Sequence, residues 1–145
     1  MGIAINEIEE KDYLNILSIG NNELGCNSSI EDVVTHYKRV KEDERYKTFV
    51  ALIDGEAVGY ISSVWSYDIG SKIGFIHIVG LAVKTEMQHK GIGTKLIQYI
   101  ENYAIEKGID NIILNTGVQR TNAHAFYKNK GYDNHSWCFN KKLSE

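Results

Sequence analysis

The sequence predicts a single α/β domain of 145 residues, with a mixed and mostly antiparallel central sheet flanked by helices. Three observations predict this fold class. Two strand-like runs flank the turn signal at Asp54 and Gly55, which is typical of a β-hairpin. An apolar run over residues 74–83 leads through a glycine-rich turn into an amphipathic helix. Another strand-like run over residues 109–116 completes a strand–helix–strand unit, whose two strands should be parallel through a right-handed crossover.

A short strand and two helices are predicted before the hairpin. Residues 3–8 alternate in polarity as a strand does, and residues 11–22 and 29–44 carry apolar side chains at helical spacing. Ser28 or Ser29 can cap the second helix, because a serine oxygen accepts a hydrogen bond from the first helical turn. These elements precede the hairpin strands in the chain.

The hairpin strands and the long helix have clear limits. The strands are predicted over residues 48–53 and 58–65, and the helix ends at Gly108, a residue suited to a helix C-terminus. The apolar stripe of this helix consists of Leu96, Ile97, Ile100, Tyr103 and Ala104. The chain has no proline, repeat, low-complexity stretch or linker, so we expect one domain over residues 1–145.

Composition limits the classes of function. The formal net charge of −3 does not favour nucleic acid or an anionic membrane as a partner. No apolar run approaches the ~20 residues of a membrane span, and the N-terminus lacks the pattern of a signal peptide. We therefore expect a cytoplasmic protein with no membrane partner. Cys26 and Cys138 are too few for a disulfide framework and have no metal-site spacing, so we interpret them as ordinary small residues.

The glycine-rich turn before the long helix predicts an anion site. Gly91 and Gly93 let backbone N–H groups approach a phosphate closely, and the helix adds unpaired donors and the positive end of its dipole. Two better-known phosphate motifs do not fit this turn. Met87 stands where a P-loop requires glycine, and Leu96 stands where a dinucleotide-binding fingerprint requires its third glycine.

Two motifs carry a resemblance to a known family. The first is Gln88-x-x-Gly91-x-Gly93 at the start of the helix, and the second is Ala-His-x-Phe-Tyr over residues 123–127. With one helix and one strand between them, they resemble the motifs of the GNAT superfamily of acyl-CoA-dependent N-acetyltransferases. The resemblance implies the GNAT fold, and residues 136–143 are similar to its closing strand.

The resemblance also implies where acetyl-CoA binds. Its pantetheine arm would pair with the main chain of a strand end, as a short extra strand does, and its pyrophosphate would lie on the glycine-rich turn. The coenzyme-binding candidates are Leu81, Ala82, Val83, Gln88, His89, Lys90, Gly91, Ile92, Gly93, Thr94, Asn122 and Phe126. Gly80 either marks a bulge that opens the strand or packs closely against a neighbouring side chain.

Acyl transfer to an amine requires an acid and a base. Tyr127 matches the family's general acid, with a core aromatic as the alternative interpretation. Val79 occupies the place where many relatives carry a glutamate base, so His77, which shares a strand face with Val79 under strict alternation, is our candidate base. A water relay ending at Glu23 or Asp68 is the alternative. His124 is interpreted as a packing or capping residue, and the remaining histidines form no set of metal ligands, so no metal is predicted.

The predicted function is transfer of the acetyl group of acetyl-CoA to a primary amine, by direct attack in a ternary complex. The alternative is a non-catalytic acyl-CoA-binding sensor or partner-binding module of the same fold. A small-molecule acceptor is favoured over a protein, and a homodimer is left open. Side chains that could attract a cationic amine are Glu23, Glu31 and Asp68, and those that could line an acceptor pocket are Tyr13, Tyr37, Trp65 and Tyr67.

Overall fold

The computed structural model describes residues 2–144 and divides into two compact units. The first unit runs to Ile113 and the second begins at Leu114. The first contains the sheet with three long helices, and the second contains one short helix and the C-terminal segment. Each unit is described by itself below.

The first unit is built on a sheet whose strands follow one another in chain order. The strands are β1 (Ala4–Glu7), β2 (Tyr46–Ile53), β3 (Glu56–Ser66), β4 (Phe75–Val83) and β5 (Ile112–Leu114). The first four pair antiparallel, and the short β5, whose last residue belongs to the second unit, lies beside β4. This mixed sheet with flanking helices confirms the predicted fold class.

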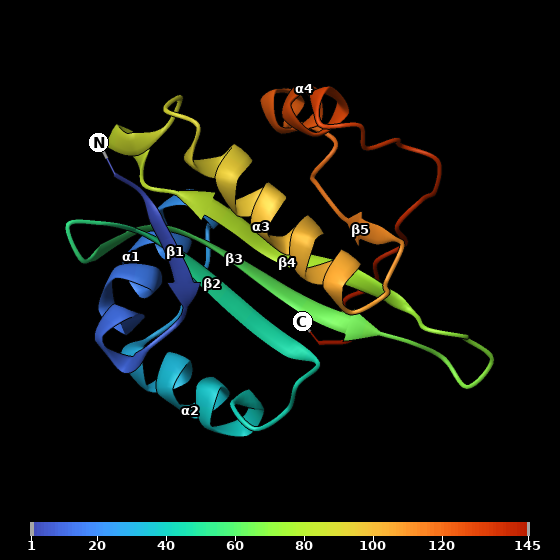
Figure 1. Ribbon diagram of the computed structural model, residues 1–145, viewed down its shortest axis with the longest axis horizontal. Helices are drawn as coiled ribbons and strands as arrows, with labels where there is room; N and C mark the ends of the chain where they lie inside the picture. The colour runs from blue at the N-terminus through green and yellow to red at the C-terminus, as the bar shows by residue number, and fades with distance from the viewer. Residues whose placement is uncertain (1, 145) are drawn as a thin grey trace. The chain divides into compact units, whose positions relative to one another are not determined.

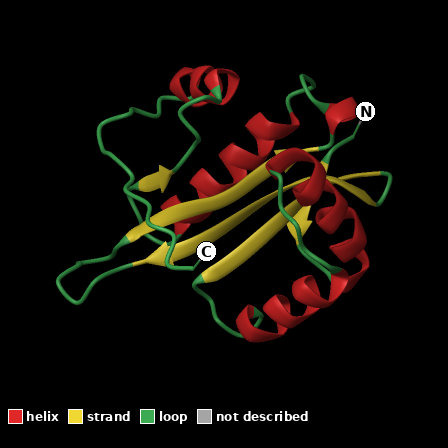
Figure 2. Ribbon diagram, turned by 180° about the vertical axis from the view of Figure 1, so that it is seen from behind, coloured by secondary structure: helices red, strands yellow, loops and turns green. Residues whose placement is uncertain are grey.

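Helices of the first unit lie on both faces of the sheet (Figures 1 and 2). These helices are η1 (Glu10–Asp12), α1 (Tyr13–Leu24), α2 (Ile30–Val40), η2 (Thr85–Met87) and α3 (Ile92–Glu106). On α3, Leu96, Ile97 and Ile100 are fully buried because the apolar stripe lies against the sheet. On the other face, α1 and α2 cover a core that includes Val50 and Tyr60.

Local sequence signals explain the ends of these elements. The hairpin turns at Asp54 and Gly55, both with positive φ (50° and 81°), as a type I′ turn requires. Ser29 caps α2. Its side chain accepts a hydrogen bond from Asp32 N at 3.2 Å, and the Asp32 carboxylate accepts one from Ser29 N at 2.8 Å. These turns and caps lie where the sequence predicted them.

The C-terminus of α3 explains why β5 is shorter than predicted. Gly108 has a φ of 76°, and the N–H of Ile109 bonds to the carbonyl of Ala104 at 2.8 Å, which is a Schellman motif. Ile109, predicted as the first residue of a strand, is therefore used to end the helix. Only three residues, Ile112–Leu114, form the strand.

A bulge interrupts β4 and corrects one prediction. Ser62 pairs with Gly80 but Ser63 pairs with Ile78, so Val79 is an extra residue in β4. Strict alternation from His77 to Val79 was therefore predicted wrongly, because the register shifts between them. Both interpretations of Gly80 are found: it adjoins the bulge, and a Cβ there would lie 3.4 Å from the Tyr60 ring.

The second unit contains α4 (Thr121–Asn129), and His124 Nε2 lies 2.8 Å from the carbonyl oxygen of Gly117. That contact ties the helix to the preceding turn, as expected for a packing or capping role. The predicted closing strand over residues 136–143 is wrong, since these residues form no strand. Trp137 and Phe139 alternate as in a strand, but both side chains are exposed, and alternation yields a strand only where a neighbour pairs with it. That the chain folds as one domain stays a prediction.

Candidate active site

The glycine-rich turn presents an open helix N-terminus. Gly91 is the N-cap of α3, with a φ of 83°, and no side chain caps the helix. The first hydrogen bond of the helix at this turn runs from Lys95 N to Gly91 O at 3.1 Å. The N–H groups of Ile92, Gly93 and Thr94 precede that bond, so helix geometry leaves them without intrahelical acceptors. Three donors and the positive end of the dipole therefore converge on one place, which suits an anion.

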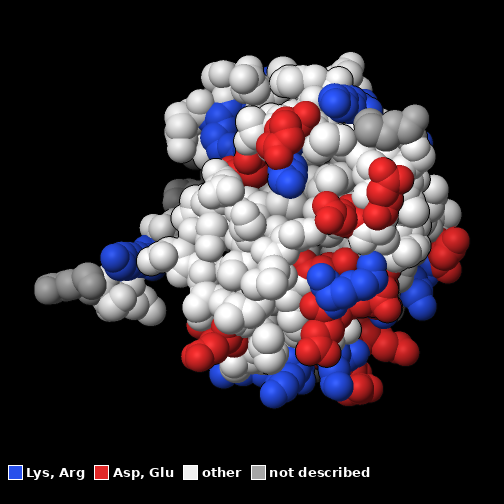
Figure 3. Space-filling view, turned by 90° about the vertical axis from the view of Figure 1, so that its left-hand side faces the viewer, with Lys and Arg blue, Asp and Glu red and all other residues white. Residues whose placement is uncertain are grey.

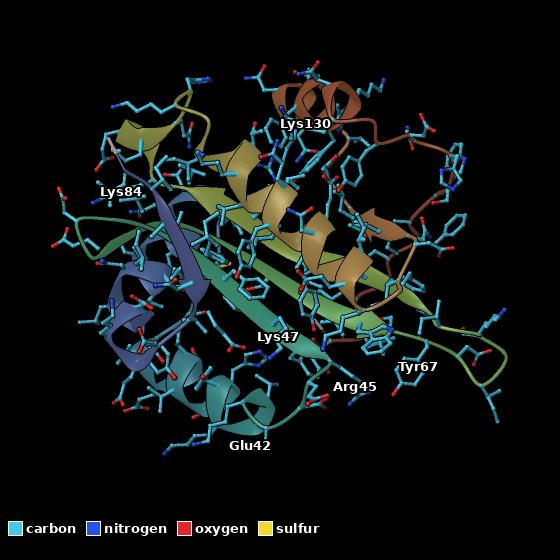
Figure 4. All side chains as sticks on the ribbon, in the orientation of Figure 1. Glu42, Arg45, Lys47, Tyr67, Lys84 and Lys130 are labelled. Carbon is cyan, nitrogen blue, oxygen red and sulfur yellow. The ribbon has the colours of Figure 1, made fainter. Side chains whose placement is uncertain are left out.

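The residues before Gly91 shape the approach to this helix. His89 has a positive φ of 62°, which is uncommon for a residue other than glycine, and its side chain and that of Lys90 are exposed. Lys84, at the end of β4 (Figure 4), forms an ion pair with Glu86 at 3.5 Å. The exposed side chains of His89 and Lys90 therefore place two basic groups near the open N-terminus of α3.

Gln88 holds the turn to its surroundings rather than extending freely into solvent. Its Nε2 donates to Val83 O and to Glu23 Oε1, each at 2.9 Å. The other oxygen of Glu23 accepts a hydrogen bond from Thr85 Oγ1. Glu23 of α1 therefore binds the turn through both carboxylate oxygens, a role that was not predicted from the sequence. A water relay that ended at Glu23 would therefore reach two carboxylate oxygens that already accept hydrogen bonds.

The end of β4 carries the predicted main-chain site for pantetheine. Leu81, Ala82 and Val83 pair with β3 on one side, opposite Ile61, Tyr60 and Gly59. On the other side, the chain leading into β5 meets the beginning of β4, where Ile76 N donates to Asn111 O at 3.0 Å. The end of β4 that holds Leu81 is thus remote from that bond.

A cavity of about 470 Å³ lies where α1 and α2 cover the sheet. Its walls include Tyr13, Ile16, Val33, Tyr37, Tyr60 and Val64. Tyr13 and Tyr37 were predicted to line an acceptor pocket, and their rings lie 5.3 Å apart. Trp65 and Tyr67 were predicted to join them but do not line it. Trp65 Nε1 instead donates to Ile73 O at 2.6 Å, and Tyr67 lies beside it at the β3–β4 connection (Figure 4).

Tyr60 lies at the bulge end of this cavity. A Cβ on Gly20 of α1 would lie 3.1 Å from its hydroxyl oxygen, and one on Gly80 of β4 would lie 3.7 Å from it. Burial raises the pKa of Tyr60 to about 12, so its hydroxyl is protonated at neutral pH. Val79, the bulge residue, also lines the cavity. Tyr60 could not be identified from the sequence, because its placement depends on two glycines from other elements.

The two remaining candidates for the base lie off this cavity. His77 is at the register position opposite Val64, but only Val64 is among the lining residues, and Asp68 does not line the cavity either. Neither side chain is therefore placed to contact a molecule in the cavity directly.

The second motif lies in the second unit. Tyr127 of α4 packs against the rings of Phe126 and Tyr132, with centroids 5.3 and 5.9 Å away. Burial raises the pKa of Tyr127, and the nearby charge of Arg120 offsets part of that rise. The hydroxyl is therefore protonated at neutral pH and can donate a proton. Asn122, the other candidate on α4, is exposed.

Charged groups are mixed over the surface that Figure 3 shows. Lys, Arg, Asp and Glu side chains are interspersed on the face in Figure 3, so no single sign covers it. Within residues 2–144, no three His, Cys, Asp or Glu side chains gather closely enough to hold a metal ion. No helix in the same range is long and apolar enough to cross a membrane.

Comparison with known proteins gives matches over most of the chain. A sequence model of the acetyltransferase (GNAT) family matches residues 5–132. An uncharacterized N-acetyltransferase from Methanocaldococcus jannaschii is 42% identical over 85 residues, which cover 58% of this chain and 51% of that protein. The match thus spans about half the length of that relative.

Two further similarities extend along nearly the whole chain. An aminoalkylphosphonate N-acetyltransferase from Salmonella typhimurium is 28% identical over 147 aligned residues, covering 97% of this chain and 88% of that protein. The solved structure of an aminoglycoside N-acetyltransferase in complex with CoA has a TM-score of 0.84, at 14% identity, over 99% of this chain and 96% of that one. At this identity the structural likeness shows the fold alone.

Proposed function

The chain belongs to the acetyltransferase (GNAT) family, and from this premise we propose that it transfers the acetyl group of acetyl-CoA to a primary amine. The reaction we propose is direct attack of the amine on the thioester in a ternary complex. The acceptor is a small molecule, as the name of the related aminoalkylphosphonate N-acetyltransferase suggests.

The open N-terminus of α3 carries this proposal. The N–H groups of Ile92, Gly93 and Thr94, which helix geometry leaves without intrahelical acceptors, suit a pyrophosphate, and the positive φ of Gly91 turns the chain into the helix without a Cβ in the way. The dipole contributes only about 0.3–1 kcal/mol per charge, so summed N–H contacts supply most of the binding. Lys90 adds positive charge beside the phosphates.

The remaining coenzyme contacts follow from the two motifs. The amide groups of pantetheine pair with the main chain of Leu81, Ala82 and Val83, as an added strand pairs with a sheet edge. From α4, Asn122 and Phe126 are assigned to the coenzyme through the Ala-His-x-Phe-Tyr motif. Gln88 acts indirectly, because its bonds to Glu23 and Val83 fix the turn that carries the donors.

Two proton transfers complete the proposed reaction. The amine loses a proton as its nitrogen bonds to the thioester carbon, and the sulfur of coenzyme A gains one as the carbon–sulfur bond breaks. We assign the second proton to Tyr127, whose phenol is protonated at neutral pH. We assign the first to His77 acting through water, since this side chain does not line the cavity.

Calorimetric titration with acetyl-CoA, followed by thiol release against a panel of primary amines, tests the function. Tight binding with release on one class of amine is the expected result. Binding without release on any amine would favour the alternative, a non-catalytic acyl-CoA-binding module, for which the valine in place of the strand glutamate is the support. Absence of binding would overturn the assignment of residues 88–94.

A further inference from the structure

We propose that the acceptor is a primary monoamine with an apolar, aromatic body, and that diamines and polycationic aminoglycosides are poor acceptors. The inference rests on the proposed function and narrows its substrate class. Four properties of the cavity under α1 and α2 carry it: its aromatic wall, its carboxylates that already have partners, its basic lining residues and one tyrosine hydroxyl beside the β4 bulge.

The wall of the cavity suits a flat apolar body. Tyr13 and Tyr37 form a tilted ring pair, with centroids 5.3 Å apart and planes 59° apart. Tyr13 and Tyr60 belong to the buried core, and Val33 and Tyr37 pack against it, so the wall is preformed. An added aromatic ring gains edge and face contacts with such tyrosines beyond its area burial. The volume of about 470 Å³ is in the usual range for small-molecule sites.

Both carboxylates that line the cavity already accept a hydrogen bond or form an ion pair. Glu7 forms an ion pair with Lys47, labelled in Figure 4, at 2.8 Å. Asp32 accepts a hydrogen bond from Ser29 N at 2.8 Å as part of the α2 capping box. A second ammonium group entering the cavity would lose its water and would find Glu7 already paired with a cation and Asp32 already bonded to the Ser29 N–H, so its desolvation is only partly offset.

Two basic residues, His36 and Lys41, also line the cavity at exposed positions, His36 on α2 and Lys41 directly after it. Lys41 repels a further cation at any pH in the neutral range. The arrangement therefore discriminates against polycations through repulsion as well as through the lack of a partner.

We assign the amine to one hydroxyl of the cavity, that of Tyr60. Thr48 and Ser62 pair with each other at 2.9 Å, and Ser63 donates to Lys47 O at 3.1 Å. The Tyr60 hydroxyl lies beside Gly80, next to the β4 main chain proposed for pantetheine. A neutral phenol can accept a hydrogen bond from an amine N–H there. The amine of the acceptor is thus assigned to Tyr60 and its aromatic body to Tyr13 and Tyr37, all of which line one cavity.

Two readouts separate this inference from the proposed function. Calorimetry on the protein saturated with CoA measures amine binding, and thiol release from acetyl-CoA measures transfer. The amines are phenethylamine, hexylamine, hexamethylenediamine and kanamycin. We expect phenethylamine to bind most tightly and hexylamine to bind at least about tenfold more tightly than hexamethylenediamine, a difference caused by one added charge.

A charge variant locates the discrimination in the cavity. Lys41→Glu should improve the binding of hexamethylenediamine about threefold or more while leaving hexylamine within about twofold. The matched control is Lys38→Glu, the same change on an exposed residue of α2 that does not line the cavity, and it should leave both amines unchanged. Equal effects of the two variants would overturn a local origin.

Each outcome decides one of the two claims. Phenethylamine that binds as expected without thiol release on any amine supports the substrate class and overturns the transferase. Thiol release with kanamycin or hexamethylenediamine in preference to phenethylamine supports the transferase and overturns the substrate class. Tighter binding of hexylamine than of phenethylamine would overturn the aromatic part, and failure of all four amines to bind would overturn the inference as a whole.

Discussion

Tyr60 and Tyr127 illustrate how burial prepares a phenol for use. Burial raises the pKa of both hydroxyls, so both are protonated at neutral pH, but they lie in different units and have different proposed tasks. Tyr60 offers a hydrogen-bond partner to an amine, and Tyr127 offers a proton to a leaving thiolate. The Tyr127 phenol, with a pKa above that of a thiol, gives up its proton only as charge develops on sulfur.

At the residue scale, Tyr127→Phe should lower kcat by about 10²–10⁴-fold, the range for acid–base groups, with little change in acetyl-CoA affinity. The ring is kept, so its packing against Phe126 and Tyr132 is kept as well. Steady-state thiol release and calorimetry measure the two quantities. Wild-type kcat in this variant would disprove the acid role.

Tyr132→Phe is the matched control, because it removes a hydroxyl from a neighbouring ring in the same unit. It should keep kcat within about threefold. The variant His77→Asn tests the base: it should lower kcat/KM at least about tenfold if His77 takes the proton through water. An unchanged kcat/KM would instead indicate that the amine loses its proton to solvent.

At the element scale, α3 offers its two ends for a matched comparison. Gly91 and Gly108 both have positive φ (83° and 76°), and a Cβ would meet nothing within 4 Å at either position. Alanine at either position should therefore cost a similar free energy of unfolding, about 1–2 kcal/mol, through backbone strain alone.

Only Gly91→Ala should affect the coenzyme. Its strain is relieved by moving the turn, which misaligns the N–H groups of Ile92 to Thr94, so we expect acetyl-CoA affinity to fall at least about tenfold. Gly108→Ala should keep that affinity. Urea unfolding and calorimetry on both variants make the comparison, and equal affinities would place the pyrophosphate elsewhere.

The same elements show how far sequence patterns reach. The hairpin turn, the cap of α2 and the end of α3 were predictable, because each depends on a few consecutive residues with definite backbone preferences. The bulge at Val79 was not, because it depends on the register between β3 and β4. The closing strand failed for a related reason, since alternation at Trp137 and Phe139 does not supply a pairing partner.

The same distinction between consecutive residues and distant elements applies to prediction of the site. The anion-binding turn is contiguous, so Gln88, Gly91 and Gly93 identified it from the sequence. Other contacts join elements far apart in the chain. Gln88 donates a hydrogen bond to Glu23, and Tyr60 lies between Gly20 and Gly80. Residue types alone carry no information about such contacts.

At the scale of the whole molecule, the buried tyrosines should make the fold sensitive to alkali. The pKa values of Tyr13, Tyr60, Tyr103 and Tyr127 are all raised, mainly by burial. Above a pH of about 10 the unfolded chain loses phenolic protons that the folded chain keeps, so the unfolded state binds fewer protons. The free energy of unfolding must therefore fall as the pH rises through this range.

Tyr60→Phe isolates the largest of these contributions. Its pKa of about 12 in the folded protein implies that Tyr60 loses about 1 kcal/mol of its contribution to stability between about pH 9 and pH 11. The wild-type free energy of unfolding should decline relative to that of the variant by this amount over that interval, because phenylalanine does not titrate. Lysine deprotonation affects both proteins alike and cancels in the difference. Urea denaturation of the two proteins at several pH values measures it, and a difference that stays constant would show that Tyr60 is not desolvated as the packing against Gly20 and Gly80 requires.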